Sequence, residues 1–194
     1  MNGLFILFKP LNYLRIKHSQ KVHWDITIPL ILAFLVTMAF LLLPEEIQVF
    51  KDGGLIKEIN NLLQILAGFY IASLAAVATF SKTDLDELMQ GEPVKLTIKR
   101  EGQKQTIHLT RRLFLCSLFG FLAYMSIFLY LFGVAANLLV DNLIGFIPAA
   151  CLVYSKTTFI FVFLLVFSNI MVTTLIGLYY MSDRMHRFEP KLEE

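Results

Sequence analysis

Four long apolar runs dominate the pattern of hydrophobic and polar positions along the 194-residue chain: residues 26–43, 62–80, 113–140 and 157–181. None of them contains an Asp, Glu, Lys, Arg or His residue. Each reaches the roughly 18 residues that a helix needs to cross the hydrocarbon core of a bilayer, since an α-helix rises about 1.5 Å per residue. The pattern therefore predicts an all-α polytopic membrane protein with four transmembrane helices.

Basic residues lie almost entirely on alternate sides of these runs. Most of the 17 Lys and Arg residues lie before the first run, between the second and third runs, or after the fourth. The other two loops contain only Lys51, Lys57 and Lys156. Because Lys and Arg are enriched in cytoplasmic loops, this bias predicts that both termini and the loop 81–112 are cytoplasmic.

The residues before the first run combine aromatic and basic side chains. The apolar stretch Leu4 to Phe8 is too short for the core of a secretory signal. The composition instead favours a segment on the inner membrane face, with Trp24 as a lipid anchor at the headgroup level. The chain thus divides into a cytoplasmic interfacial N-terminal segment 1–25, a four-helix transmembrane domain 26–181 and a cytoplasmic tail 182–194.

The loop between the second and third runs, residues 81–112, changes from a helical to an alternating pattern. After Pro93, the stretch VKLTIKREGQKQTIHLT alternates apolar and polar residues around a possible two-residue turn at Glu101-Gly102. This pattern predicts a cytoplasmic β-hairpin inserted between the second and third helices. An isolated hairpin is marginal in water, so its apolar face needs cover from its own bundle, from other protomers or from another protein.

The register of this hairpin places basic residues directly opposite each other across the strands. Like charges in such pairs are destabilising, and an acidic protein surface or anionic headgroups would remove that cost. We therefore expect a partner-binding surface made of Lys95, Lys99, Arg100, Lys104 and His108. In the alternative interpretation, the lysines are ordinary edge-strand residues that guard against aggregation.

Two further groups of residues are expected to make contacts at the membrane. Arg111 and Arg112, directly before the third run, are predicted to be anionic-lipid anchors. The second run carries small residues at three- and four-residue spacing, which lets helix backbones approach closely in lipid. These residues are expected to form an oligomer interface or, alternatively, to pack only inside their own bundle: Gly68, Ala72, Ala75, Ala76 and Thr79.

Several function classes lack the residues that they require. The runs contain no Asp, Glu, Lys, Arg or His residue, which argues against a pump or an ion-coupled transporter. The polar residues of the fourth run could hydrogen-bond between helices or line an oligomeric pore: Ser168, Asn169, Thr173 and Thr174. No phosphate-binding loop, nucleophile elbow or His pair at metal-ligand spacing occurs, so we expect no enzyme activity, cofactor or metal. The small basic patch has no aromatic residue, which argues against direct binding of nucleic acid.

Three stretches in this four-span layout carry a resemblance to a known family: FYIASLAAVATF, GEPVKLTIKREGQKQTIHLTRR and LFGFLAYMSIFLYL. Together they resemble the membrane subunit of the Kiwa anti-phage defence system, over most of the chain. The resemblance implies a bacterial inner-membrane protein that oligomerises, senses phage infection at the envelope and works with a cytoplasmic DNA-binding effector subunit.

The residues and the resemblance lead to one hypothesis and one alternative. The hypothesis is a non-enzymatic scaffold or sensor that contacts membrane lipid, forms a homo-oligomer and docks a cytosolic effector protein through the hairpin. The alternative is an oligomeric pore or membrane-depolarising effector that acts by itself. Expression of the chain alone separates the two, because only a pore depolarises the cell.

Overall fold

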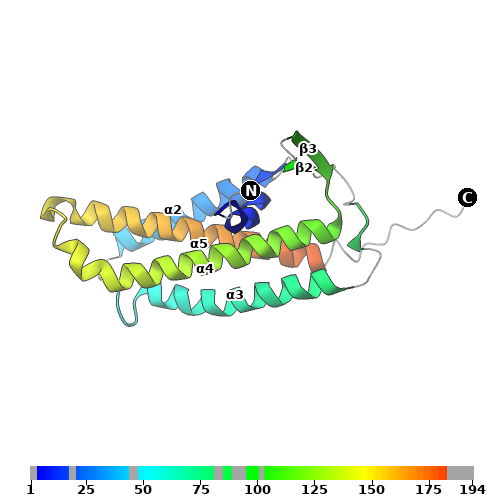
Figure 1. Cartoon of the computed structure of the whole chain (residues 1–194). Coiled ribbons are helices and arrows are strands. Elements are labelled where there is room, and N and C mark those ends of the chain that lie inside the picture. The colour runs from blue at the N-terminus through cyan, green and yellow to red at the C-terminus, as the bar shows by residue number, and fades with distance from the viewer. Residues whose placement is uncertain are drawn as a thin grey trace, which may run out of the picture.

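The computed structural model describes residues 4–17, 21–43, 48–80, 85–88, 95–100 and 103–182. Four long helices run side by side along one axis (Figure 1), and they are α2 (Ile28–Leu42), α3 (Leu55–Thr79), α4 (Arg111–Ile144) and α5 (Leu152–Ser182). A π-helical turn, η2 (His23–Thr27), precedes α2, and a 3-10 turn, η4 (Ala149–Cys151), precedes α5. The prediction of four helices long and apolar enough to cross a membrane is confirmed.

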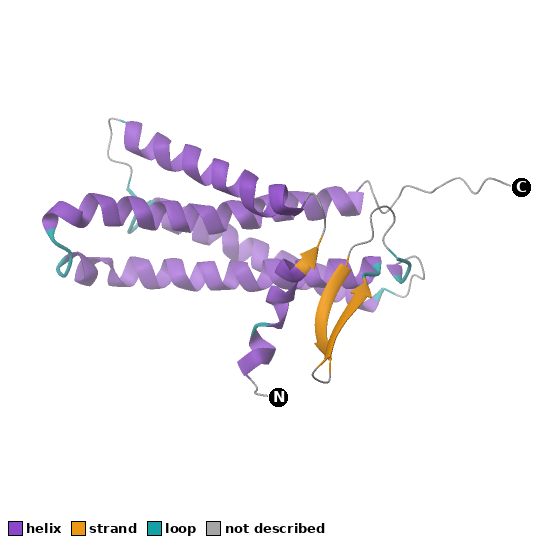
Figure 2. Ribbon diagram, turned by 90° about the horizontal axis from the view of Figure 1, so that it is seen from above, coloured by secondary structure: helices purple, strands orange, loops and turns teal. Residues whose placement is uncertain are grey.

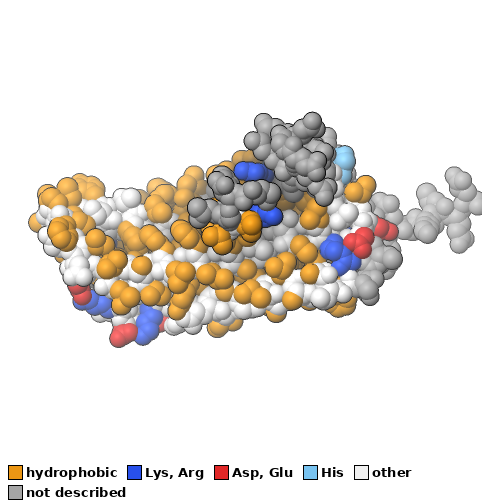
Figure 3. Space-filling model, viewed as in Figure 1, with side chains coloured by type: hydrophobic (Ala, Val, Ile, Leu, Met, Phe, Trp, Pro, Cys, Tyr) orange, Lys and Arg blue, Asp and Glu red, His pale blue; other side chains and the backbone are white. Residues whose placement is uncertain are grey.

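The outer surface of the bundle is the one expected for helices surrounded by lipid. Hydrophobic side chains cover the visible face along most of its length, while charged side chains gather near the two ends and beside the N-terminal residues (Figure 3). In lipid, apolar side chains face outward as well as inward, because the solvent is itself apolar. Exposed Phe128, Leu131 and Leu138 on α4 illustrate the outward-facing set.

α4 and α5 form the centre of the bundle, with α3 on α4 and α2 on α5. α4 packs along α3 on one side and against α5 on another, whereas α2 packs along α5. The largest completely buried side chains come mainly from these contacts, and they include Tyr70, Leu118, Phe121, Leu122 and Phe163. α2 buries Pro29, Ala33 and Thr37.

Two polar side chains of α5 bond to other parts of the chain. The hydroxyls of Tyr70 on α3 and Thr174 on α5 are 2.5 Å apart, and Thr174 also donates to the Ile170 carbonyl at 2.6 Å. Asn169 Nδ2 donates to the carbonyl of Asp25 at 2.7 Å, and Ser168 and Thr173 are buried. Bonding between elements of one chain is therefore seen for Asn169 and Thr174, while Thr173 is buried without a hydrogen-bond partner among the described residues.

The first described residues form an arm on the bundle, which we call the N-terminal arm and define as residues 4–17. It contains α1 (Leu4–Leu7), the 3-10 helix η1 (Lys9–Arg15) and a short strand, β1 (Ile16–Lys17). η1 packs against α4, and the Tyr13 ring stacks on Phe121 with 4.8 Å between the ring centroids. Burial raises the pKa of the Tyr13 hydroxyl, and the nearby Asp25 carboxylate adds to this effect.

A small antiparallel sheet lies at one end of the bundle, where α4 begins. Its order is β1-β2-β3, with β2 at Lys95–Arg100 and β3 at Gln103–His108. Figure 2 shows the sheet projecting to the same side of the bundle as the N-terminal arm. The pairing of β1 with β2 links the first residues of the chain to the loop between α3 and α4.

Close approach of α3 and α4 depends on Gly133. A Cβ atom at this position would lie 2.6 Å from Asn60 Oδ1 and 2.8 Å from Asn60 Nδ2. Asn60 is buried on α3, and its Nδ2 donates to the Tyr130 carbonyl at 3.4 Å. The missing side chain of Gly133 therefore makes room for a polar side chain between the two helices.

We predict that Gly133→Ala lowers the stability of the folded protein by about 1–3 kcal/mol, the usual cost of forcing extra volume into a packed interior. A thermal melt in detergent measures the effect. Gly120→Ala on the same helix is the matched control, because nothing lies within 4 Å of a Cβ there. In an Asn60→Ala background the Gly133→Ala penalty should shrink. Equal melting temperatures for Gly133→Ala and Gly120→Ala would contradict this account.

Candidate functional site

The three-stranded sheet determines which of the predicted partner-binding residues share a face. Lys95 lies opposite His108, and Lys99 lies opposite Lys104. Residues at alternate positions of a strand point to the same face, so these four positions share one face of the sheet. The structure describes the backbone of 95–100 and 103–107 but not their side chains, whereas His108 is exposed. The register thus brings four of the five predicted residues together.

β1 adds a residue that the sequence analysis missed. Lys17 lies opposite Lys95, so the basic face runs across all three strands. Arg100 was predicted with this set, but it pairs with Gln103 and falls on the opposite face with Leu96 and Ile98. The alternation of Arg15, Ile16 and Lys17 was the signal for β1, although such a short stretch carries little weight alone. We define the basic face as Lys17, Lys95, Lys99, Lys104 and His108.

The opposite, apolar face of the sheet is anchored beside the bundle. Ile16 lies opposite Leu96 and is 4% exposed. Leu109, directly after β3, is 1% exposed and belongs to the same buried cluster as Leu115 at the start of α4. The buried residues at both margins of the sheet therefore attach it to the bundle, as a marginal hairpin requires.

The connection from α3 to α4 is held by Arg112. Its guanidinium donates to both carboxylate oxygens of Asp86, at 2.7 and 3.0 Å, and to the carbonyls of Val77 and Phe80, at 2.8 and 2.6 Å. A planar guanidinium suits such a two-pronged contact, and a positive charge at the C-terminal end of α3 complements the helix dipole. The sequence analysis assigned Arg112 to lipid headgroups and missed these contacts.

Arg111 takes part in the same connection. Its side chain is 11% exposed and lies 3.6 Å from the carboxylate of Glu87, while its backbone N–H donates to the Glu87 carbonyl at 3.0 Å. Thr110 caps α4, because its hydroxyl accepts from the N–H of Leu113 at 3.3 Å. An isolated antiparallel β-bridge between Leu88 and Thr110 further connects residues 85–88 to the start of α4. Both arginines, predicted as lipid anchors, therefore have protein partners that fix the start of α4.

The small residues of the second run lie on the surface of the chain. Gly68, Ala72, Ala75, Ala76 and Thr79 are all exposed on α3. Nothing lies within 4 Å of a Cβ added at Gly68. Within the described part of the chain, packing inside the bundle does not account for these small residues, and their face can meet lipid or another protein.

The remaining predicted residue, Trp24, lies in η2 and is 44% exposed. It neighbours a pair of ionised residues, Lys21 and Asp25, whose side chains are 14% and 7% exposed and bonded to each other. Lys21 Nζ also lies 4.3 Å from the centroid of the Tyr13 ring. This cluster couples the N-terminal arm to the start of α2.

Among the described residues, no group of three His, Cys, Asp or Glu could hold a metal ion.

We predict that Arg112→Lys loosens the start of α4, because a lysine cannot reach the carboxylate and both carbonyls together. Cys116, one turn along α4 and partly exposed, is the local probe. Its rate of reaction with a maleimide should rise several-fold in Arg112→Lys and stay unchanged in Arg15→Lys, a matched change at an exposed arginine.

The same contact has a pH dependence of known sign. The hydrogen bond from Arg112 holds the pKa of Asp86 below its ordinary value of 3.8. A carboxylate with a lowered folded-state pKa stabilises the fold above the ordinary value, and this stability is lost as the pH falls through the folded-state pKa. Acidification should therefore raise the reactivity of Cys116 less in Asp86→Asn than in the unmodified chain. Each rate is divided by the rate of a free thiol at the same pH.

Comparison with known proteins gives no match. No family model, no curated protein and no solved structure matches the chain. What the chain does must therefore follow from its own residues and geometry. These are four apolar helices, a sheet with one basic face at one end of them, and an exposed face of small residues on α3.

Proposed function

We propose that this chain is a non-enzymatic scaffold or sensor of the bacterial inner membrane that docks a cytosolic effector protein through the basic face of its sheet. The observation that carries the proposal is the register of the sheet, which gathers Lys17, Lys95, Lys99, Lys104 and His108 on one face at one end of a membrane-spanning bundle. The matching partner surface is acidic, because opposed lysines lose their repulsion when a carboxylate lies between them.

The geometry of the sheet supports docking of a protein. The sheet projects from the side of the bundle (Figure 2), so its basic face is not sandwiched between the four long helices. Its margins are anchored by buried Ile16 and Leu109, which gives a partner a fixed surface to bind. A fixed surface binds more tightly than a mobile one, because less conformational entropy is lost on association.

The distribution of charge supports the proposed orientation. α2 and α4 begin at the end of the bundle that carries the sheet, and α3 and α5 finish there (Figure 1). The lysines of the opposite end are few, namely Lys51, Lys57 and Lys156. Under the positive-inside rule, this distribution supports a cytoplasmic location for the sheet, both termini and the tail 182–194. In this orientation the basic face is within reach of cytosolic proteins.

The exposed small residues of α3 support a homo-oligomer. The small residues Gly68, Ala72, Ala75 and Thr79 share one exposed face of α3, and such a face lets the backbone of a second helix approach closely. Gln64 lies on the same side of α3, about one turn before Gly68, and is exposed. An amide facing lipid lacks hydrogen-bond partners, whereas an amide at a contact between copies can find them.

A role in anti-phage defence rests on the resemblance of the chain to the membrane subunit of the Kiwa system. In that role, the membrane part responds to infection at the envelope and the cytosolic effector carries out the response. The alternative of a pore that acts alone has less support, because Thr173 and Thr174 are buried inside one chain and Asn169 bonds to Asp25.

We predict that reversing Lys95, Lys99 and Lys104 together to Glu abolishes retention of the cytosolic partner at the membrane. Single exposed ion pairs contribute only about 0.2–1 kcal/mol, so one substitution should have little effect, whereas three reversals replace attraction by repulsion. The measurement compares the cytosolic proteins that co-purify with tagged chains expressed from the native gene neighbourhood. Raising the salt concentration should weaken the unmodified association in the same direction.

The matched control reverses Lys51, Lys57 and Lys156, the same number of lysines at the opposite end. This variant should retain the partner, and both variants should insert into the membrane equally. Retention by the first variant at low salt would refute docking on the basic face. Loss of membrane potential on expression of the unmodified chain alone would favour the pore.

We predict that Gly68→Leu and Ala72→Leu shrink the detergent-extracted particle without unfolding the chain. Both residues are exposed in the single chain, so a leucine finds room there, but it separates the backbones of two α3 helices packed face to face. Light scattering gives the particle mass, and a thermal melt shows whether the fold survives. An unchanged mass for both variants would leave this face to lipid.

A further inference from the structure

The N-terminal arm combines two buried side chains with several exposed ones. Tyr13 and Ile16 are 3% and 4% exposed and pack on the bundle. The arm also exposes apolar side chains and two basic ones, namely Ile6, Leu7, Phe8, Lys9, Leu14 and Arg15. No acidic residue occurs in the arm. Such a combination of exposed apolar and basic side chains is typical of segments that lie in the surface of an anionic membrane.

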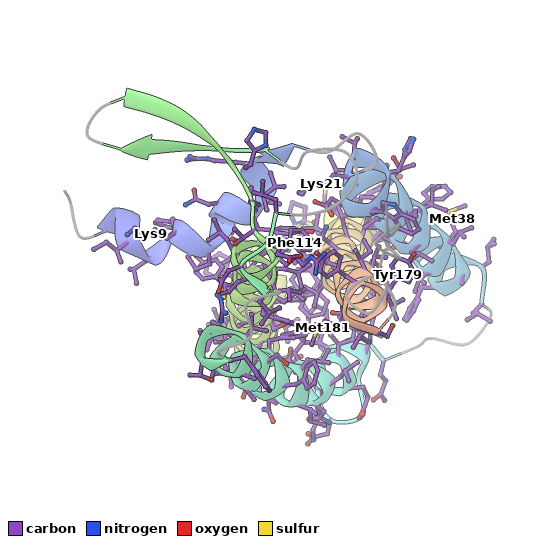
Figure 4. All side chains as sticks on the ribbon, turned by 90° about the vertical axis from the view of Figure 1, so that its right-hand side faces the viewer. Lys9, Lys21, Met38, Phe114, Tyr179 and Met181 are labelled. Atoms are coloured by element: carbon purple, nitrogen blue, oxygen red, sulfur yellow. The ribbon has the colours of Figure 1, made fainter. Side chains whose placement is uncertain are left out.

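The arm also points in the direction that a membrane surface requires. Figure 2 shows that it projects sideways, across the long axis of the four helices. In the view along that axis the arm leads away from the bundle toward Lys9 (Figure 4). If the helices cross the bilayer, a segment at a steep angle to them runs along its surface.

Contacts between the helices define one level across the bundle. Tyr13 of the arm stacks on Phe121 of α4. On the antiparallel helix α5, Gly177 faces Leu118, since an added Cβ there would lie 2.9 Å from Leu118 Cδ2. Because α4 and α5 are antiparallel, a step of three residues from Leu118 to Phe121 on α4 matches a step from Gly177 to Thr174 on α5. Phe121 and Thr174 are therefore at about the same height along the bundle axis. We call this height the arm level.

The distance from the arm level to the other end of the bundle matches a bilayer. From Phe121 to Asp141, α4 extends by roughly 20 residues, or about 30 Å, which is the thickness of the hydrocarbon core. Asp141 pairs with Lys51 at 3.1 Å, and both side chains are exposed at that end. The span that contains α2, His23–Leu42, has the same length at 20 residues.

The complete length of α4 does not fit into the core. Its 34 residues extend about 51 Å, which would require a tilt above roughly 50°, whereas transmembrane helices tilt by about 0–40°. Moving the bundle so that Arg111 lay at the boundary would sink Lys9 and Arg15, both exposed, about 15 Å into hydrocarbon. Exposed charges are costly at such depth.

We propose that the N-terminal arm binds the anionic headgroup surface of the leaflet at the sheet end, with the boundary of the hydrocarbon core at the arm level. The ends of α3 and α4, together with the sheet, then stand clear of the core. Exposed large apolar side chains in the last turn of α3 and the first turn of α4 are Phe80 and Leu113. This inference goes beyond the docking function and does not depend on it.

The position of the arm is tested with a fluorophore at Phe8. Phe8→Cys is made in a Cys116→Ser, Cys151→Ser background, labelled with bimane and reconstituted into vesicles of phosphatidylglycerol and phosphatidylcholine. A nitroxide near the headgroup should quench the label several-fold more than a nitroxide near the chain end. Phe128→Cys, on the exposed face of α4 within the core, should show the opposite order. A Phe8 label that neither nitroxide quenches would overturn the proposal.

The headgroup charge is tested with the same label. Lys9→Glu with Arg15→Glu should lower the quenching of the Phe8 label severalfold, because anionic headgroups then repel the arm. Lys51→Glu with Lys57→Glu is the matched control and should leave the quenching unchanged. Equal quenching with and without the reversal at Lys9 and Arg15 would overturn recognition of anionic headgroups.

The level of the boundary is tested by thiol reactivity. Leu113→Cys should react with a water-soluble maleimide at least about tenfold faster than Phe128→Cys, because the thiolate that reacts forms only in contact with water. Both residues are exposed on α4, and they differ in predicted depth. Equally slow reactions would place the start of α4 in lipid and overturn the level. Loss of partner docking would alter none of these readouts, so the two proposals fail separately.

Discussion

Ionisable side chains are costly in the hydrocarbon core of a bilayer, and this constraint determines where the charges of this protein lie. At one end of the bundle, Lys51 pairs with Asp141 across the turn between α2 and α3 and the end of α4. At the other end, Arg112 bonds to Asp86 and to the last carbonyls of α3. Lys21 and Asp25, at the start of the span that contains α2, are almost completely buried and neutralise each other. The apolar surface between these groups is left for lipid.

α4 connects the two charged ends of the bundle with the other elements of the molecule. It packs with α3, α5 and η1, and the start of α4 is fixed by the Thr110 cap and by both arginines. The N-terminal arm lies on α4 through Tyr13 and continues as β1 into the sheet. The surface proposed to bind lipid and the surface proposed to bind a protein are therefore neighbours on one short segment. The two are joined by β1, because Ile16 and Lys17 end the arm and also form the edge strand of the sheet.

The sequence was most informative where a property is local. Each of the four runs identifies its helix, because a helix in lipid satisfies its own backbone and needs only about 20 apolar residues to do so. The alternating pattern from Lys95 to His108 likewise predicts the pairs Lys95–His108 and Lys99–Lys104, and the sheet has both pairs. The strand β1 escaped prediction because its two residues owe their extended form to pairing with β2, far along the chain. Arg100 was placed with the partner-binding set on charge alone, although its position in the strand assigns it to the other face.

The sequence by itself determined the number of membrane-spanning helices and the separation of charge between the ends of the bundle, because hydropathy and charge are properties of single residues. Only the tertiary structure decided which way each helix face points. The small residues of α3 could have packed inside the bundle, and they lie outside it because Asn60, Leu63 and Tyr70 occupy the side that meets α4 and α5. Arg112 similarly acquired its role from the fold, since the carbonyls that it binds become available only where α3 ends beside the start of α4.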